Sequence, residues 1–406
     1  MNTPEIVVTG LGMVSPAGVD PPANWATLRS GVSVATHDPE LDGLPVDFSC
    51  AVPDFDPDTL LGRRTSWRLD RFAHMALVAA RDATADAGID TGTVDATRVG
   101  VVLGVTGNSP NHYARAFAHL AEGDYRSMSP LFVPRSIPNM AAGEVALDQG
   151  FQGPNLVTAT ACASGTTAIG VARDLLRSGT CDVVVTGGSE SLRSPVYAAT
   201  YWRMNALAHD IPPSEASRPF DPRRSGFVLG EGAGIMTLER AEHARARGAR
   251  ARARVAGYGA SADAHHFTRP EPQGHGAQLA IRAALDDAEL DPSEVDHVNA
   301  HATSTPIGDL AEARALRATL PAPPPVTALK SVIGHAHGAA GSLEAAAAVL
   351  TLEHQEIPPT ANLDHIDPEI GLDVVTKAPR LASIRTVLST SVGFGGQNAA
   401  LLLTSA

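Results

Sequence analysis

The sequence predicts an α/β protein of two similar halves, each with a mixed sheet, with helices packed between the halves. Short apolar, β-branched segments alternate along the chain with alanine-rich helical segments, which is the pattern of strands covered by helices. In addition, one unusual unit occurs twice, at residues 154–176 and 326–352. Each copy runs from a strand through a polar junction into a helix whose first turns are rich in Gly, Ala and Ser. Small residues there allow close helix packing, so we expect both helices at the centre.

The apolar segments of the first half are predicted as buried strands, several of which end in a glycine turn. These segments are residues 5–12, 98–104, 154–158 and 182–188. The helical segments between them are residues 73–87, 129–147 (a loop and a helix) and 166–176. Residues 227–238 are rich in glycine but lack both the G-x-G-x-x-G order and the following Lys of phosphate-binding loops. We interpret these glycines as positions where the backbone passes close to a neighbouring element, just before a strand begins.

The second half repeats this alternation after a connecting segment. Residues 240–254 are dense in Arg and Ala and predict a helix with a charged face. We therefore place the boundary there, with units at residues 1–250 and 251–406. The strands expected in the second unit are residues 253–259, 295–301, 326–330 and 388–392, and the helices are residues 276–288, 309–320 and 334–352.

Composition excludes several classes of protein. The 406 residues are 44% apolar and 18% charged, which is typical of a globular chain. A net charge of −13 argues against nucleic acid as the main partner, because phosphate binding needs a broad basic surface. No segment has the features of a signal peptide, and none approaches the roughly 20 apolar residues that span a bilayer. Three scattered cysteines favour a reducing cytoplasm over a disulfide framework.

Cys162 lies at the first strand-to-helix junction, where unpaired backbone N–H groups and the positive end of the helix dipole converge. Such an environment stabilises a thiolate, so a lowered thiol pKa and a nucleophilic role are expected. The alternative is a buried structural cysteine, which is equally compatible with this stretch alone.

Three further ionisable residues, His301, Lys330 and His335, are predicted at strand ends of the second half. A cysteine with one histidine could form a hydrolase dyad, whereas two histidines and a lysine suit acyl transfer with stabilisation of a carbanion or enolate. His335 and His337 could also be metal ligands. Residues two apart point in different directions on a helix, however, and no ligand cluster lies nearby, so no metal is expected.

Two other motifs are compatible with either structure or function. Phe394 is flanked by glycines. They could let the backbone approach another group closely and present an N–H to it, they could let the phenylalanine ring move as a gate, or they could simply form a turn. Thr303 and Thr305 could cap a helix or contact a ligand.

Taken together, four motifs in this order resemble the β-ketoacyl-acyl-carrier-protein synthases, in particular the elongating type II enzymes with a Cys-His-His centre. The similarity runs from about residue 5 to residue 403. The motifs are Thr160-Ala-Cys-Ala-Ser-Gly165, Asn299-Ala-His-Ala-Thr-Ser-Thr-Pro-Ile-Gly-Asp309, Lys330-Ser-Val-Ile-Gly-His-Ala-His-Gly-Ala-Ala-Gly341 and Gly393-Phe-Gly-Gly-Gln-Asn398. The resemblance implies a thiolase-like fold, in which two duplicated βαβαβαββ-type halves form a five-layered α-β-α-β-α arrangement.

The resemblance also implies a role for each of these residues. Cys162 would carry an acyl chain as a thioester, while His301 and His335 promote decarboxylation of malonyl-carrier protein and stabilise the enolate. The N–H groups of Cys162 and Phe394 would form an oxyanion hole. The resemblance further places Lys330 beside the histidines, paired with Glu344. Thr303 and Thr305 would contact the phosphopantetheine arm, Phe394 would gate the acyl pocket, and no metal, nucleotide or redox cofactor would be needed.

The implied partners are an acyl carrier protein and a second subunit, which would be either an identical chain or a chain-length factor. Carrier proteins of this kind are acidic, so the basic residues of the segment 61–71 become docking candidates on an otherwise acidic enzyme. These residues are Arg63, Arg64, Arg68 and Arg71. Without the resemblance, the same segment would be interpreted as an ordinary solvated face.

Some positions depart from the family's pattern and leave the pathway open. Ala302 and Val392 replace the usual glycine and phenylalanine, and residues 106–113 are more polar than a plain fatty-acyl channel suggests. The alternative to fatty acid synthesis is therefore a type II polyketide ketosynthase, including one that makes polyenes, with a chain-length-factor partner. A non-catalytic chain-length factor lacks the nucleophile, and a thiolase needs a second cysteine near the C-terminus, where none follows Cys181.

Overall fold

A computed structural model describes residues 4–107 and 109–406, so Asn108 of the predicted polar segment lies outside the described residues. Ten of the strands in this part of the chain form one continuous sheet, in the order β10-β9-β13-β14-β8-β1-β7-β6-β4-β5. The first-half strands are β1 (Ile6–Val14), β4 (Val99–Gly104), β5 (Asn155–Thr158), β6 (Val183–Ser191) and β7 (Glu231–Arg240). The second-half strands are β8 (Ala253–Ala262), β9 (His297–Asn299), β10 (Val326–Thr327), β13 (Thr386–Gly393) and β14 (Gln397–Ser405).

The strand order is symmetric about the pair β1 and β8, which joins the halves through Val7 opposite Arg254 and Val8 opposite Ala253. Each half follows the pattern βαβαβαββ. The principal helices are α4 (Arg71–Ala87), α7 (Met140–Gln149) and α8 (Ser164–Arg177) in the first half, and α12 (His275–Ala288), α13 (Pro306–Thr319) and α15 (Ala340–His354) in the second. The predicted duplication is thereby confirmed. We propose the boundary between residues 250 and 251, in the turn that precedes β8.

Further helices and strands lie outside this framework of ten strands and six principal helices. Before residue 150 they are α1 (Pro21–Ser30), β2 (Thr36–His37), β3 (Phe48–Ser49), α2 (Pro57–Leu61), α3 (Arg63–Ser66), α5 (Pro110–Ala121) and α6 (Phe132–Ser136). The later ones are α9 (Pro195–Arg203), α10 (Pro213–Ala216), α11 (Ala241–Ala246), α14 (Lys330–Ile333), β11 (Glu356–Ile357) and β12 (Arg380–Leu381). Among the described residues, no helix has the length and apolar content needed to cross a membrane.

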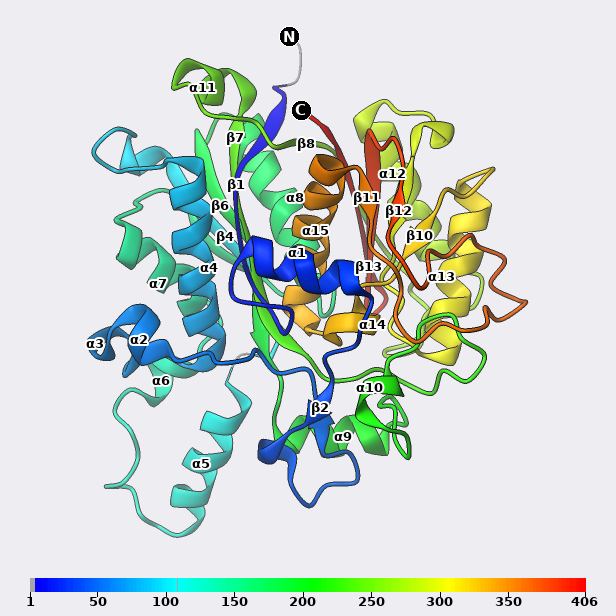
Figure 1. The fold of residues 1–406 in the computed structure, drawn as a ribbon. Helices are drawn as coiled ribbons and strands as arrows, with labels where there is room; N and C mark the ends of the chain where they lie inside the picture. Colours follow the sequence, from blue (N-terminus) through cyan, green and yellow to red (C-terminus); the bar gives the residue numbers. More distant parts are fainter. Residues whose placement is uncertain (1–3, 108) are drawn as a thin grey trace.

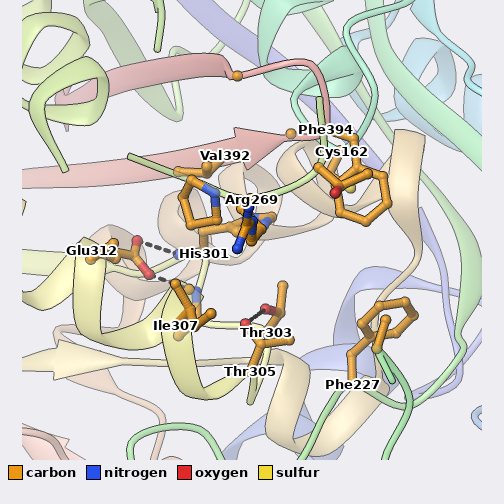
Figure 2. Close-up of a pocket in the computed structure, with 18 of the residues that line it drawn as sticks. Cys162, Phe227, Arg269, His301, Thr303, Thr305, Ile307, Glu312, Val392 and Phe394 are labelled. Carbon is orange, nitrogen blue, oxygen red and sulfur yellow. Dashed lines mark hydrogen bonds between the residues drawn. The ribbon is translucent and has the colours of Figure 1, made fainter. Parts of the chain in front are cut away.

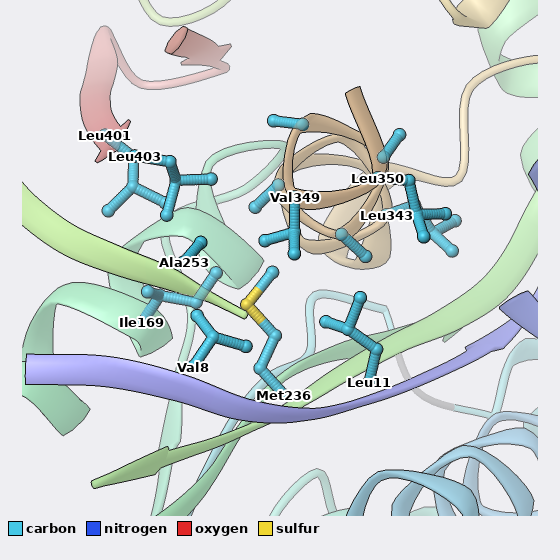
Figure 3. Close-up of a cluster of buried hydrophobic side chains, with 14 of the residues drawn as sticks. Val8, Leu11, Ile169, Met236, Ala253, Leu343, Val349, Leu350, Leu401 and Leu403 are labelled. Atoms are coloured by element: carbon cyan, nitrogen blue, oxygen red, sulfur yellow. The ribbon is translucent and has the colours of Figure 1, made fainter. Parts of the chain in front are cut away.

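The elements form five layers, as the resemblance implied. Figure 1 shows α4 and α7 outside the first-half strands, α12 and α13 outside the second-half strands, and α8 with α15 in the middle. Apolar residues of both central helices and of both halves form the largest core cluster. In Figure 3 these side chains meet, with Val349 and Leu343 of α15 above Met236 and Leu11, and Leu401 to one side.

Three local predictions are wrong, each for a physical reason. β5 is partly exposed because it is an edge strand that pairs only with β4 in the sheet. The charged connecting helix is restricted to α11, since Gly248 adopts a φ of 74° and the residues from Ala253 onward join the sheet. The strand predicted over residues 326–330 ends early, so that Lys330 begins α14 and α15 starts only at Ala340.

The two central helices touch where their glycines lie. A Cβ added to Gly165 of α8 would lie 2.9 Å from the Ser342 nitrogen and 3.0 Å from the Gly338 oxygen. A Cβ added to Gly341 of α15 would overlap the Thr166 hydroxyl. The small-residue pattern of the two repeated units therefore serves to bring α8 and α15 into backbone contact.

We expect Gly341→Ala to lower the free energy of unfolding by about 1–3 kcal/mol, because the added methyl group overpacks the α8–α15 contact. Gly143→Ala in α7 is the matched control, since its added Cβ has only the Met140 sulfur as a neighbour, at 3.9 Å. That substitution should be neutral or stabilise by up to about 1 kcal/mol through helix propensity. Denaturant unfolding of the two variants measures both effects, and equal stability would contradict the packing argument.

Candidate active site

Cys162 lies in a tight elbow between β5 and α8. Ala161 just before it adopts a φ of 49°, in the left-handed region. The Ser164 hydroxyl accepts a hydrogen bond from the Thr160 N–H at 2.9 Å and donates one to the Ala161 carbonyl at 2.7 Å. These bonds hold the elbow, so Cys162 sits two residues before the helix with its side chain at the wall of a cavity.

His335 is held opposite Cys162 by strand-like backbone bonds to residues 228–230. Its N–H donates to the Val228 carbonyl at 2.8 Å, and its carbonyl accepts from the Gly230 N–H at 3.0 Å. This places the His335 Nε2 atom 3.0 Å from the Cys162 sulfur. A nucleophile and a base are thus within hydrogen-bond reach.

His301 and Lys330 complete a buried cluster around this pair. The backbone N–H of His301 donates to Glu312 at 2.8 Å, and its ring lies 5.5 Å from that of His335, measured between centroids. Lys330 Nζ is 3.3 Å from His301 Nδ1 and forms a buried ion pair with Glu344. Because an ammonium can only donate, this contact puts the proton of neutral His301 on Nε2. The structure therefore brings together the four ionisable residues singled out in the sequence.

Burial sets the protonation states of the cluster. It holds the pKa of both His301 and His335 well below the usual value, and the nearby Lys330 charge lowers both further. Burial also raises the pKa of the Cys162 thiol to about 12, against the opposing effects of Lys330 and of the Phe394 and Cys162 N–H groups. The expected lowering of the thiol pKa is therefore wrong, because desolvation outweighs the helix N-terminus. A neutral thiol therefore faces a neutral imidazole at hydrogen-bond distance.

The Gly-Phe-Gly-Gly loop is the turn between β13 and β14, and it passes directly beside the nucleophile. A Cβ on Gly393 would lie 2.7 Å from the Thr160 oxygen and 3.0 Å from the Cys162 nitrogen, so a larger residue does not fit. The N–H groups of Phe394 and Cys162 both lower the pKa of the sulfur, which means that they face it. Backbone N–H groups beside a nucleophile are the kind of donor that an oxyanion hole uses.

Cys162, His301, His335 and Phe394 line a cavity of about 430 Å³. In Figure 2, Phe394 lies beside Cys162, while Thr303, Thr305 and Ile307 lie together elsewhere on the wall. The Thr303 and Thr305 hydroxyls are 3.0 Å apart. Other residues also line the cavity, and no local sequence pattern indicated that they would lie there. They include Tyr201, Phe227, Arg269 and Glu312.

His337 differs from its prediction. The chain at His337 is not α-helical, and the rings of His335 and His337 stack with centroids 4.5 Å apart and planes 20° apart, so they do not point away from each other. Within residues 4–107 and 109–406, no group of three or more His, Cys, Asp or Glu residues is arranged to hold a metal ion.

The four docking candidates divide into two kinds. Arg63 and Arg64 are exposed on α3. Arg71 donates twice to the buried Glu231 at 2.6 Å, and Arg68 pairs with Glu144 at 2.6 Å, so these two charges have internal partners. Figure 1 places α3 at one edge of the molecule and α13, which contributes to the cavity, at the opposite edge.

Comparison with protein-family models now identifies the class of enzyme. The N-terminal domain model of β-ketoacyl synthases matches residues 3–244, and the C-terminal domain model matches residues 252–364. These matches cover most of the chain, and three of the four motifs lie within them: residues 160–165, 299–309 and 330–341. The chain belongs to the β-ketoacyl synthase family.

Individual relatives agree with this assignment. The chain is 38% identical over 403 residues to 3-oxoacyl-[acyl-carrier-protein] synthase 2 of Staphylococcus aureus strain COL, covering 98% of this chain and 97% of the relative. The ishigamide ketosynthase/chain length factor structure matches with a TM-score of 0.94, 35% identity and full coverage of both chains. A type II PKS acyl-carrier protein in complex with its ketosynthase, bound to the hexaketide, matches with a TM-score of 0.92, 29% identity and full coverage.

The pKa shift of His335 leads to a pH prediction for the thiol. Because the folded-state pKa of His335 lies well below the ordinary value of about 6.5, the imidazole stays neutral as the pH falls through that value. The rate of Cys162 alkylation by iodoacetamide should therefore show its acid limb below about pH 6.5. A His335→Asn variant that remains folded has no base, so its rate should follow the thiolate fraction and fall by about tenfold per pH unit throughout the range below the thiol pKa, with no plateau. A wild-type limb centred at or above the ordinary value would contradict the neutral-pair geometry.

Proposed function

We propose that this protein catalyses decarboxylative Claisen condensation between an acyl-Cys162 intermediate and malonyl-acyl-carrier protein, which yields 3-oxoacyl-acyl-carrier protein and carbon dioxide. The observation that carries the proposal is the 3.0 Å contact between Cys162 and His335, with His301 and Lys330 in the same buried cluster. One histidine would suffice for thioester hydrolysis. The second, with its Nε2 proton fixed by Lys330, provides the donor that an enolate requires.

In the first step, the Cys162 sulfur attacks the thioester carbonyl of an acyl-carrier protein. Its proton passes to His335 Nε2 and then to the departing pantetheine sulfur, so a new thioester forms as the old one breaks. The developing oxyanion accepts hydrogen bonds from the Cys162 and Phe394 N–H groups. Because the thiol is neutral at rest, attack and proton transfer are coupled.

In the second step, malonyl-carrier protein loses its carboxylate as carbon dioxide, and the released electron pair forms an enolate. His301 donates from Nε2 to the enolate oxygen. His335 supplies a second N–H after its ring has lost the Nδ1 proton to solvent and gained one from solvent at Nε2. The enolate carbon attacks the acyl-Cys162 carbonyl, forming the carbon–carbon bond and expelling the Cys162 thiolate, which regains a proton from solvent. Burial of Lys330 beside Glu344 keeps one positive charge close to His301 and gives it an acidic partner.

The cavity wall accounts for the remaining roles in the proposal. Thr303 and Thr305 contact the amide-containing phosphopantetheine arm, and Phe394 gates the acyl chamber from its glycine-flanked turn. Since the electrophile stays covalently bound to Cys162, the reaction needs no metal, nucleotide or redox cofactor. The three free cysteines favour the reducing cytoplasm as the place of work.

The proposed partners are an acyl carrier protein and a second subunit. Structural relatives include a ketosynthase with its carrier protein and a ketosynthase with a chain length factor. Two pathways therefore remain in the proposal, namely fatty acid elongation by a homodimer and type II polyketide synthesis with a chain-length factor. None of the described residues of the polar segment 106–113 lines the cavity, so this segment favours neither pathway. Mass spectrometry of carrier-bound products from a panel of starters distinguishes them.

We expect Cys162→Ala to abolish both acylation and condensation. His301→Ala should still accept an acyl group on Cys162 but release carbon dioxide from malonyl-carrier protein at least about 100-fold more slowly, because the enolate loses its donor. Intact-protein mass and carbon dioxide release measure the two half-reactions. Cys181→Ala is the matched control, since Cys181 is a buried cysteine outside the cavity, and should behave as wild type. Elongation by Cys162→Ala would refute the mechanism.

For carrier-protein docking, we propose Arg63 and Arg64 as the main contacts, with Arg68 and Arg71 contributing less because each already has an acidic partner. Arg63→Glu with Arg64→Glu should weaken binding of an acidic carrier protein by about tenfold at low salt, and less at high salt. Arg282→Glu, at an exposed position on α12, changes net charge by half as much and should have little effect. Equal affinities for all three proteins at low salt would argue against this surface.

A further inference from the structure

The ring of His335 is held in an unusual way for a catalytic base. In nucleophile–base pairs, a third group normally accepts a hydrogen bond from the other ring nitrogen and so fixes the orientation of the base. His335 Nε2 faces Cys162, but its buried Nδ1 has no hydrogen-bond partner. Backbone bonds fix the position of the residue, yet no hydrogen bond besides that to Cys162 fixes the rotation of its ring.

Aromatic packing takes the place of that hydrogen bond. The His337 ring stacks on His335 at 4.5 Å with planes 20° apart, and Phe227 meets His335 edge-on at 5.4 Å and 90°. Phe227 also meets His337 edge-on, at 5.5 Å. Tyr201 stacks in turn on His337 at 5.3 Å and 20°. The rings of His335, His337 and Tyr201 thus form a stack. His335 at one end of the stack contacts Cys162, and Phe227 packs against the side of the stack.

His337 is a costly residue to place there. Its side chain is 2% exposed, and neither ring nitrogen has a partner at hydrogen-bond geometry. Its backbone adopts a φ of 44°, in the left-handed region that costs a non-glycine residue roughly 1–2 kcal/mol. Burial and the Lys330 charge lower the pKa of His337 to about 3, although the backbone of His335 partly offsets them, so the ring is neutral. A leucine would fill the same space without unpaired nitrogens, but it would present no flat face.

We propose that His337 is a positioning residue, whose stacked ring fixes the rotation of His335 that directs Nε2 toward the Cys162 sulfur. The inference rests on the proposed function, because the rotation of His335 matters only if His335 acts on Cys162. The geometry itself, however, is present in the resting pair of thiol and imidazole. In acylation, the thiol proton moves to His335 Nε2 as the carbon–sulfur bond forms. A rotated ring would therefore slow proton transfer without altering the affinity for the carrier protein.

The test compares His337→Phe, which keeps a flat ring, with His337→Leu and His337→Gln, which do not. Alkylation of Cys162 by iodoacetamide reports the thiol–imidazole pair without any acyl substrate: the sulfur displaces iodide and the proton passes to His335. We expect His337→Leu and His337→Gln to be alkylated, and acylated by acyl-carrier protein, at least about tenfold more slowly, with unchanged KM for the carrier protein. His337→Phe should stay within about threefold of wild type.

Two outcomes would overturn the inference: wild-type alkylation rates in both His337→Leu and His337→Gln, or a folded His337→Phe that is as slow as they are. Thermal unfolding identifies any variant that fails to fold. If His337→Leu fails to fold, the rates of His337→Gln decide the test. Tyr201→Leu, which removes the support behind His337, should shift the alkylation rate in the same direction by a smaller factor. Failure of the proposed function would appear separately, as condensation by Cys162→Ala while the His337 variants are alkylated at the expected rates.

Discussion

The backbone contact between α8 and α15 is the constraint on which the active site depends. Cys162 precedes the first turn of α8, and His335 precedes the short turn that leads into α15. Their side chains can meet at 3.0 Å only because Gly165 allows the start of α8 to lie against Gly338 and Ser342. Glycine at these places is therefore a catalytic requirement exerted through packing. The same contact buries the largest apolar cluster, so fold stability and site geometry arise from one interface.

Burial then determines what chemistry the contact supports. A solvated cysteine at a helix N-terminus would tend toward the thiolate, but here desolvation favours the neutral thiol and neutral imidazoles together. An ionised resting pair would have to be stabilised inside an apolar core. The neutral pair avoids that cost, and in the proposed mechanism it separates charge only as the carbonyl oxygen approaches the N–H groups of Cys162 and Phe394. Lys330 is the one buried cation of the cluster, and the adjacent Glu344 balances it.

Much of this arrangement could be predicted from the sequence because it depends on local sequence patterns. The two strand–junction–helix units predicted the duplication. Residue type at the junctions made Cys162, His301, Lys330 and His335 candidates, and the family resemblance supplied their expected roles. Long-range effects could not be predicted in this way. The direction of the Cys162 pKa shift depends on atoms contributed by distant segments, and the pairing of Arg71 with Glu231 joins residues 160 positions apart. β5 has the composition of a buried strand, but its place at the sheet edge follows from the order of all ten strands.

The duplicated halves also explain how one backbone design came to supply two different functions. In the first half, α8 begins at Ser164, directly after the elbow, so the junction presents a single side chain to the cavity. In the second half, a 3₁₀ turn over His337–Ala339 intervenes between His335 and Ala340, where α15 begins. That extra turn is what folds His337 back onto His335. The shorter junction presents the proposed nucleophile to the cavity, whereas the longer one holds the proposed base and the ring that stacks on it.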